Sequence, residues 1–168
     1  IAMMTGVMKD LVTDDASKET AEDVSTEATE LVGRMREIIW SMNSKNDTIE
    51  HLISYLHEYS DKYLDRNKIF CDFKLHGKAP DKNISGDKRE SVFLVTKETL
   101  HNIVKYAQSP LVNLYVTIDD KKLMVEVFDN GKGFDMNNIR RFGNGLTNMK
   151  QRIETVGGNY QIESSPGN

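Results

Sequence analysis

An acidic residue and closely spaced glycines follow an alternating apolar run in the segment FDNGKGFD, and further glycines follow in the segment GNG. Glycine lets a backbone approach a phosphate or a base closely, because no Cβ stands in the way. The P-loop pattern G-x-x-x-x-G-K-[ST] is absent, since no Lys-Ser or Lys-Thr pair follows a glycine at that spacing. Another chemistry is therefore needed for these residues, which are Asp129, Gly131, Gly133, Gly143 and Gly145.

A polar stripe runs along the helix expected for KRESVFLVTKETLHNIVKYA. At ~100° per residue, four polar side chains fall on one arc, opposite an apolar arc. A carboxylate and an amide oxygen one helical turn apart can hold a hydrated Mg²⁺, which accepts few protein ligands, and a lysine one turn further can reach a phosphate. A merely solvated helix face is the alternative that the composition leaves open. The polar arc holds Glu98, His101, Asn102 and Lys105, and the apolar arc holds Phe93, Leu100, Ile103, Val104 and Ala107.

The hydrophobic periodicity predicts the elements that position these residues. Alternation predicts strands in IFCDFKL and in two runs joined by the turn DDKK, of which the second leads into FDNGKGFD. Helical spacing predicts a helix at residues 48–64 capped by Asp47, the long helix of the polar stripe, and a helix that ends at Gly157-Gly158 before a short strand, NYQIES. The fold class predicted from this mixture is an α+β sandwich.

Residues 1–43 carry an apolar seam with steps of three and four, which predicts an antiparallel helical hairpin. Two helices with such narrow apolar stripes cannot bury these stripes well without a partner. We therefore expect a homodimer through residues 1–43, in the form of a four-helix bundle. A hairpin packed on its own domain is the alternative. The seam contains Ile1, Met4, Met8 and Leu11, and after the break TDDAS it contains Val24, Ala28, Leu31, Met35, Ile38 and Met42.

Three segments, in this order, resemble the boxes of the GHKL ATPase superfamily, whose members share a Bergerat-type two-layer α/β sandwich. ETLHNIVKYA is similar to the N-box, DNGKGF to the D-x-G-x-G box, and GNGLTNMKQRI to the second glycine box. Together with MREIIWSMN and NDTIEHLISYL, they make the chain look most like sensor histidine kinases of two-component systems. The resemblance implies a truncated dimerisation hairpin at 1–45, a connecting helix at 46–65 and a catalytic ATP-binding domain at 66–168.

The resemblance also implies ATP and Mg²⁺ as cofactors, and a role for each residue of the boxes. The carboxylate of Asp129 would accept a hydrogen bond from the adenine amino group, which distinguishes adenine from guanine. Asn102 would hold Mg²⁺, and Glu98 would position water or the attacking group. The other ATP-binding residues would be Lys105 toward phosphate, Gly131 and Gly133 along the base and ribose, and Gly143, Gly145 and Leu146 in a lid before a helix start.

The kinase implied by the resemblance transfers the γ-phosphoryl of ATP to a histidine, and then to an aspartate in the receiver domain of a response regulator. We expect that acceptor histidine upstream of Ile1, and we expect the fragment to bind ATP without phosphorylating itself. The family's last strand would follow Asn168, so either the sheet lacks this strand or the fragment ends before it. The histidines that do not fit the acceptor position are His51, His57, His76 and His101.

Composition and charge argue against several classes of function. The chain has 168 residues, of which 38% are hydrophobic, so it suits a globular domain with an appendage. A net charge of -4 argues against nucleic acid as a partner. No apolar stretch approaches the ~20 residues of a membrane span, so we expect no membrane contact within this fragment. The single cysteine, Cys71, fits a cytoplasmic setting, and anchoring of the parent protein in the inner membrane is implied by the resemblance alone.

Two other functions stay open at this point. One is a serine kinase of the anti-sigma type in the same superfamily, against which the apolar seam at residues 24–42 argues. The other is a non-catalytic dimerisation and docking module whose nucleotide pocket only senses, against which the intact Asn102 and Asp129 argue. Nucleotide titration with and without Mg²⁺ separates the docking module from an ATP-dependent kinase.

Overall fold

The structure is a computed structural model that describes residues 15–42, 47–78, 82–119, 122–136 and 144–167. The chain divides into two units, Ile1–Ser44 and Lys45–Asn168. Over the described ranges, no helix combines the length and the apolar character needed to cross a lipid bilayer.

In the described part of the first unit the backbone forms one long helix, α2 (Asp15–Met42). The predicted apolar seam is exposed on this helix at Val24, Leu31 and Met35, where 47%, 59% and 60% of the residue surface is accessible. The predicted first helix of the hairpin lies outside the described residues. The hairpin therefore stays a prediction.

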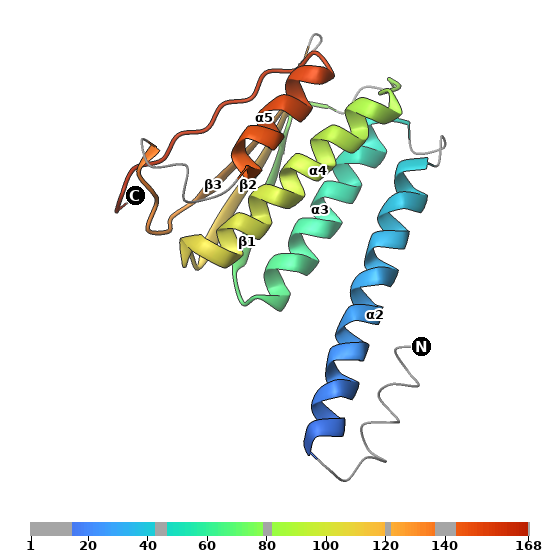
Figure 1. Ribbon diagram of the computed structural model, residues 1–168. Coiled ribbons are helices and arrows are strands. Elements are labelled where there is room, and N and C mark those ends of the chain that lie inside the picture. Colours follow the sequence, from blue (N-terminus) through green and yellow to red (C-terminus); the bar gives the residue numbers. More distant parts are fainter. Residues whose placement is uncertain (1–14, 43–46, 79–81, 120–121, 137–143, 168) are drawn as a thin grey trace. The chain divides into compact units, whose positions relative to one another are not determined.

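A three-stranded sheet forms one layer of the second unit and consists of β1 (Phe70–His76), β2 (Leu111–Ile118) and β3 (Leu123–Asp129) (Figure 1). β1 pairs in parallel with β2, and β2 pairs antiparallel with β3, so the strand order is β1-β2-β3. Alternate side chains of β2 are buried, as the period-two pattern predicted. They are Val112, Leu114, Val116 and Ile118.

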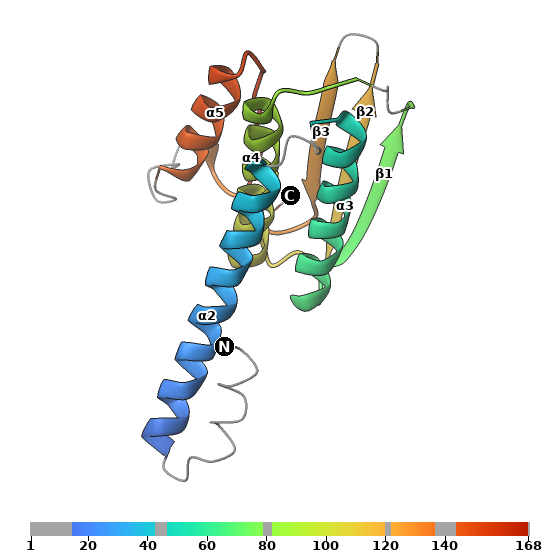
Figure 2. The ribbon, with the colours of Figure 1, turned by 90° about the vertical axis from the view of Figure 1, so that its right-hand side faces the viewer.

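Three helices form the other layer of the second unit, namely α3 (Ile49–Arg66), α4 (Gly86–Asn102) and α5 (Gly145–Thr155). They lie side by side over one face of the sheet (Figure 2). Ile53 of α3 packs against the buried side chains of β2, and Leu64 of α3 meets Leu100 of α4 and Val112. Burial of each such side chain stabilises the fold by roughly 1.5–3 kcal/mol. This core holds α4 in place over the end of β3, and the predicted α+β sandwich is confirmed.

The last turn of the predicted long helix is wider than an α-helix. Ile103–Ala107 form a π turn, and the chain leaves it at Gln108, whose φ of 57° lies in the left-handed region. π turns are rare in proteins, and those that occur often lie near functional sites. The prediction of a regular helix as far as Ala107 is wrong in this final turn.

The predicted strand NYQIES is not formed, because residues 159–164 have no strand structure. The hydrogen bonds of this C-terminal segment go to the loop after β3 instead. Ser164 Oγ accepts a hydrogen bond from the N–H of Phe134 at 3.0 Å, and the N–H of Gly167 donates to the carbonyl of Lys132 at 2.8 Å. The segment is thus attached beside the D-x-G-x-G loop, which carries Asp129.

The residues that enter α3 are fixed to the start of α4. Thr48, and not the predicted Asp47, caps α3, since its hydroxyl oxygen accepts a hydrogen bond from the N–H of His51 at 3.2 Å. The carboxylate of Asp47 pairs instead with the guanidinium of Arg89, whose side chain is completely buried. The carbonyl of Asp47 also accepts a hydrogen bond from the N–H of Ile84 at 3.0 Å. Because a buried charge without its counterion is costly, this pair ties α3 to α4.

We expect Asp47→Asn to lower the free energy of unfolding of the second unit by about 1–3 kcal/mol, because Arg89 then loses its charged partner. Urea denaturation followed by circular dichroism measures this change. Glu58→Gln is the matched control, since Glu58 pairs with Lys62 on the surface of α3, where both side chains are at least 60% exposed. We expect this control to change the stability by less than about 0.5 kcal/mol. Equal stability of Asp47→Asn and the wild-type chain would contradict the assigned role of the Arg89 pair.

Candidate functional site

The carboxylate of Asp129 is fixed at the point where β3 becomes the D-x-G-x-G loop. Its Oδ1 atom accepts a hydrogen bond from the N–H of Gly131 at 2.9 Å. The Oδ2 atom has no hydrogen-bond partner among the residues that the structure describes, and the residue is exposed. The arrangement therefore offers an oriented acceptor oxygen to a donor from outside the chain, which is what recognition of an amino group requires.

Gly131 lets this loop pass directly against the end of the π turn. A Cβ at Gly131 would lie 2.4 Å from the carbonyl oxygen of Ala107 and 2.7 Å from its Cβ, so a larger residue would displace the loop. The next N–H, that of Lys132, donates to the same Ala107 carbonyl at 2.9 Å. Gly133 follows with a φ of 58°, which favours glycine. The structure thus explains the need for both glycines within the fold, and their predicted contact with base and ribose stays a prediction.

Glu98 brings the N-box helix against the start of α5. Its Oε1 atom would lie 3.3 Å from a Cβ placed on Gly145, the first residue of α5. One residue further on, the hydroxyl of Thr99 donates to Met149 Sδ of α5 at 3.6 Å. The first N–H groups of α5 have no side-chain cap from Asn144, and a helix start of this kind attracts anions. A carboxylate and a helix start that could bind phosphate therefore lie side by side.

Asn102 and Lys105 occupy the end of the N-box helix. Asn102 is the last residue of α4 and is half-buried, whereas Lys105 is exposed in the π turn, with Nζ 5.2 Å from the centroid of the Tyr106 ring. Among the described residues, no group of three or more His, Cys, Asp or Glu side chains could hold a metal. A site for Mg²⁺ that takes a single amide oxygen and several waters does not need such a group. The roles of Asn102 toward Mg²⁺ and of Lys105 toward phosphate stay predictions.

His101 does not share the surroundings of the other polar residues on the predicted arc. Its Nε2 atom lies 3.1 Å from the hydroxyl oxygen of Tyr59, and its ring centroid lies 4.7 Å from that of Tyr63, both on α3. Helical geometry alone put His101 at the edge of the polar arc, and the packing of α3 decides which way it faces. His101 therefore faces α3, whereas Glu98 lies against the start of α5.

Two residues that support the candidate site, Ser109 and Asn130, are not predicted from the sequence. Ser109 is almost completely buried, at 4% exposure, and its hydroxyl lies 2.7 Å from Oδ1 of Asn130, the residue after Asp129. The signal in the sequence is weak, because Ser109 is a polar residue before a proline after the expected helix, and Asn130 occupies an x position of the D-x-G-x-G box. Of the remaining predicted residues, Leu146 lies half-buried in the first turn of α5. Gly143 lies outside the described residues.

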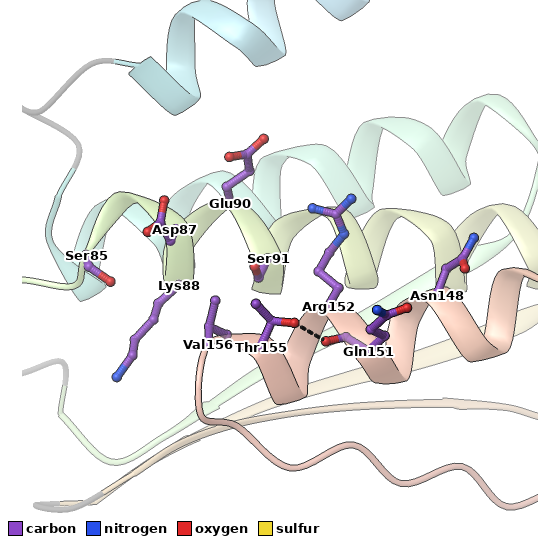
Figure 3. A pocket seen from close by; sticks show the side chains of 10 residues that line it. All are labelled: Ser85, Asp87, Lys88, Glu90, Ser91, Asn148, Gln151, Arg152, Thr155 and Val156. Atoms are coloured by element: carbon purple, nitrogen blue, oxygen red, sulfur yellow. Dashed lines mark hydrogen bonds between the residues drawn. The ribbon is translucent and has the colours of Figure 1, made fainter.

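A cavity of about 650 Å³ lies between the first turns of α4 and the face of α5 that runs from Asn148 to Thr155 (Figure 3). Its lining is mostly polar and includes Glu90 and Ser91 from α4 and Arg152 and Thr155 from α5. None of the predicted site residues lines this cavity. The cavity is therefore separate from the candidate nucleotide site.

Cys71 can be set aside as a nucleophile. The pKa of the Cys71 thiol is raised to about 11, mainly by burial and also by the nearby carboxylates of Asp61 and Asp72. A thiol with so high a pKa is protonated at neutral pH, and the thiolate is the reactive form. Cys71 is therefore not the reactive group, and the candidate reactive groups of this chain are its carboxylates and amides.

Comparison with known proteins gives sensor kinases as relatives. Sensor histidine kinase LiaS of Bacillus subtilis (strain 168) is 25% identical over 169 residues, which cover 99% of this chain and 46% of LiaS. The signal transduction histidine-protein kinase/phosphatase DegS of Brevibacillus brevis is 28% identical over 153 residues, covering 91% of this chain and 39% of DegS. The chain thus spans less than half the length of these two relatives.

Solved structures and a family model agree with these relatives. The histidine kinase domain from the Erythrobacter litoralis EL346 blue-light activated histidine kinase has a TM-score of 0.62 at 14% identity, covering 99% of this chain and 87% of that one. The Acinetobacter baumannii histidine kinase AdeS has a TM-score of 0.58 at 14% identity, with 98% and 86% covered. Both likenesses concern the fold. Residues 87–168 match the model of the histidine kinase-, DNA gyrase B-, and HSP90-like ATPase family. Residues 87–168 therefore belong to this family, and together with these relatives they support a catalytic domain of the GHKL histidine kinase type.

Proposed function

We propose that this chain binds ATP with Mg²⁺ as the catalytic part of a sensor histidine kinase. In the whole protein the γ-phosphoryl of ATP would pass to a histidine, and then to an aspartate of a response-regulator receiver domain. One observation carries the proposal: a single helix with its π turn contacts both glycine segments. Glu98 lies against Gly145 at one point, and Ala107 lies against Gly131 at another. Groups suited to a base, a metal and a phosphate therefore surround the same end of the helix layer.

Each residue of the site would contact a different part of the bound nucleotide. Oδ2 of Asp129 would accept a hydrogen bond from the adenine amino group, while Gly131 holds Oδ1. The first N–H groups of α5 would face the phosphates. Glu98 would orient the attacking group and accept its proton, in the manner of a general base. Phosphoryl transfer depends mainly on positioning and charge stabilisation, and Mg²⁺ held through Asn102 would neutralise charge on the phosphate oxygens.

Removal of the amide oxygen of Asn102 tests the assignment of the metal. We expect Asn102→Ala to abolish most of the gain in ATP affinity that Mg²⁺ gives the wild-type chain, while affinity measured in EDTA changes little. Calorimetric titration of both chains with ATP, with and without Mg²⁺, measures the difference. Asn159→Ala is a suitable control, because Asn159 lies exposed beyond the end of α5 and outside the three boxes. If the effect of Mg²⁺ survives in Asn102→Ala, another group holds the metal.

The exposed seam of α2 supports a homodimer as the assembly. Leu31 and Met35 stand one turn apart, and each exposes more than half of its surface, at 59% and 60%. Light scattering over a concentration series should show a dimer for the wild-type chain and a shift toward monomer for the double variant Leu31→Glu and Met35→Glu. Thr26→Glu, on the opposite side of the helix, should leave the mass unchanged. A monomer at every concentration of the wild-type chain would refute assembly through this seam.

A further inference from the structure

Ser109 occupies a point where three parts of the second unit meet. It follows the π turn and Gln108, it precedes β2 by two residues, and its side chain reaches the loop after β3. Its exposure is 4%, although it is a polar residue in a connection between elements. Connections of this kind are normally exposed. Such burial indicates that the hydroxyl has a specific task in the structure.

The hydroxyl oxygen of Ser109 is surrounded by four hydrogen-bonding groups. It lies 2.6 Å from the carbonyl oxygen of Leu111 and 2.7 Å from Oδ1 of Asn130. The backbone N–H groups of Leu111 and Asn130 donate to it, each at 3.3 Å. A hydroxyl has one proton and two lone pairs, so Ser109 accepts from both N–H groups and donates to one of the two oxygens at a time. The backbone of Asn130 is thereby held through its N–H, and its side chain is held when the proton points to Oδ1.

Asn130 stands between Asp129 and Gly131, so fixing it also fixes Asp129. A second attachment lies beside the first, where the N–H of Lys132 donates to the carbonyl of Ala107 at 2.9 Å. The loop is therefore bound to the end of the N-box helix at two successive points. These attachments set the position of the Asp129 carboxylate relative to Asn102, which ends α4 five residues before Ala107.

We propose that Ser109, through Asn130, is a positioning residue that sets the base specificity of the nucleotide site. The proposal rests on the function proposed above, in which Asp129 recognises adenine. An acceptor oxygen discriminates between bases only while its position is maintained, because a displaced carboxylate can accept hydrogen bonds from other donors or from water. Loss of the Ser109 hydroxyl therefore lowers the preference for ATP over GTP, beyond any effect on stability.

The test compares dissociation constants for ATP and GTP, measured with Mg²⁺, in the wild-type chain, Ser109→Ala, Asn130→Ala and the double variant. We expect each single variant to lower the ATP-to-GTP preference roughly threefold to tenfold, which is the size expected for one hydrogen bond. The double variant should lower it by no more than the larger single effect, because both changes break the same contact. Asn130 is exposed, so its variant remains informative if Ser109→Ala fails to fold.

Asn67→Ala is the matched control. Its side-chain amide donates to the carbonyl of Tyr63 at 2.7 Å at the end of α3, so the variant also removes one hydrogen bond of a connecting residue. Stability should fall slightly, and the ATP-to-GTP preference should stay at the wild-type value. Variants of Ser109 and Asn130 that weaken both nucleotides equally, or neither, would overturn the inference while the proposed function stands. Absence of any preference in the wild-type chain would overturn the proposed function itself.

Discussion

Replacement of Glu98 by glutamine is expected to lower the rate of histidine phosphorylation by roughly 10²–10⁴-fold, the usual contribution of a general base. ATP affinity should stay the same or rise, because a negative charge near the phosphates is removed. The geometric reason is the position of the carboxylate, whose Oε1 atom would lie 3.3 Å from a Cβ on Gly145 at the start of α5. The measurement is transfer from γ-labelled ATP to acid-labile, base-stable phosphoprotein, in a chain that includes the acceptor histidine.

Glu90→Gln is the control for this loss of rate. Glu90 lies on the same helix, is exposed and lines the separate cavity, so its variant should phosphorylate at the wild-type rate. A Glu98→Gln chain that is labelled as fast as the wild type would remove Glu98 from the chemistry. A variant that loses ATP binding along with labelling would assign Glu98 to nucleotide binding instead.

Asp129→Asn is expected to remove most ATP binding, at a cost of about 1–3 kcal/mol, or roughly fivefold to 150-fold in affinity. An amide can present a donor where the adenine amino group also donates, which leaves two donors facing each other. Titration calorimetry with ATP measures the loss. Asp119→Asn is a close control, because Asp119 Oδ1 accepts a backbone hydrogen bond from Lys122 at 2.8 Å, much as Asp129 does from Gly131. Unchanged affinity in Asp129→Asn would mean that adenine is recognised elsewhere.

The elements with a strong local pattern could be predicted from the sequence. β2 alternates buried and partly exposed residues along its whole length, and this is visible in the order of its apolar and polar side chains. The strand predicted at residues 159–164 shows why the same pattern can mislead. Tyr160 and Ile162 alternate with polar residues, but a strand also needs a partner, and Ser164 of this segment bonds instead to Phe134 in the loop after β3. Pairing is a property of the fold and not of the segment.

Details that depend on distant contacts could not be predicted. Asp47 and Thr48 are both good helix caps, and the choice between them follows from Arg89, which is 42 residues away from Asp47 in the chain. The π turn at Ile103–Ala107 was not visible in the apolar spacing, which fits a regular helix as far as Ala107. In the same way, His101 belongs to the polar arc by its angle, and only the position of Tyr59 shows that it faces α3.

The candidate site, too, could be predicted in its residue types but not in its contacts. The residue types that make it up, a carboxylate, an amide and glycines, are visible in the sequence, and the resemblance to the GHKL boxes placed them in one site. The structure adds which of them touch. Gly131 lies against Ala107 and Gly145 against Glu98, contacts that join residues far apart in the chain. Ser109 was missed because its importance comes from burial, which a single Ser-Pro pair does not reveal.

The central claim is that the second unit binds ATP with Mg²⁺ through the Asp129 loop and the end of the N-box helix. Calorimetric titration of the wild-type chain with ATP, and separately with GTP, in the presence and absence of Mg²⁺, tests it most directly. We expect one ATP bound per chain, weaker binding of GTP, and weaker binding of ATP when Mg²⁺ is removed. Equal affinity for the two nucleotides, or no binding of ATP at millimolar concentration, would contradict it.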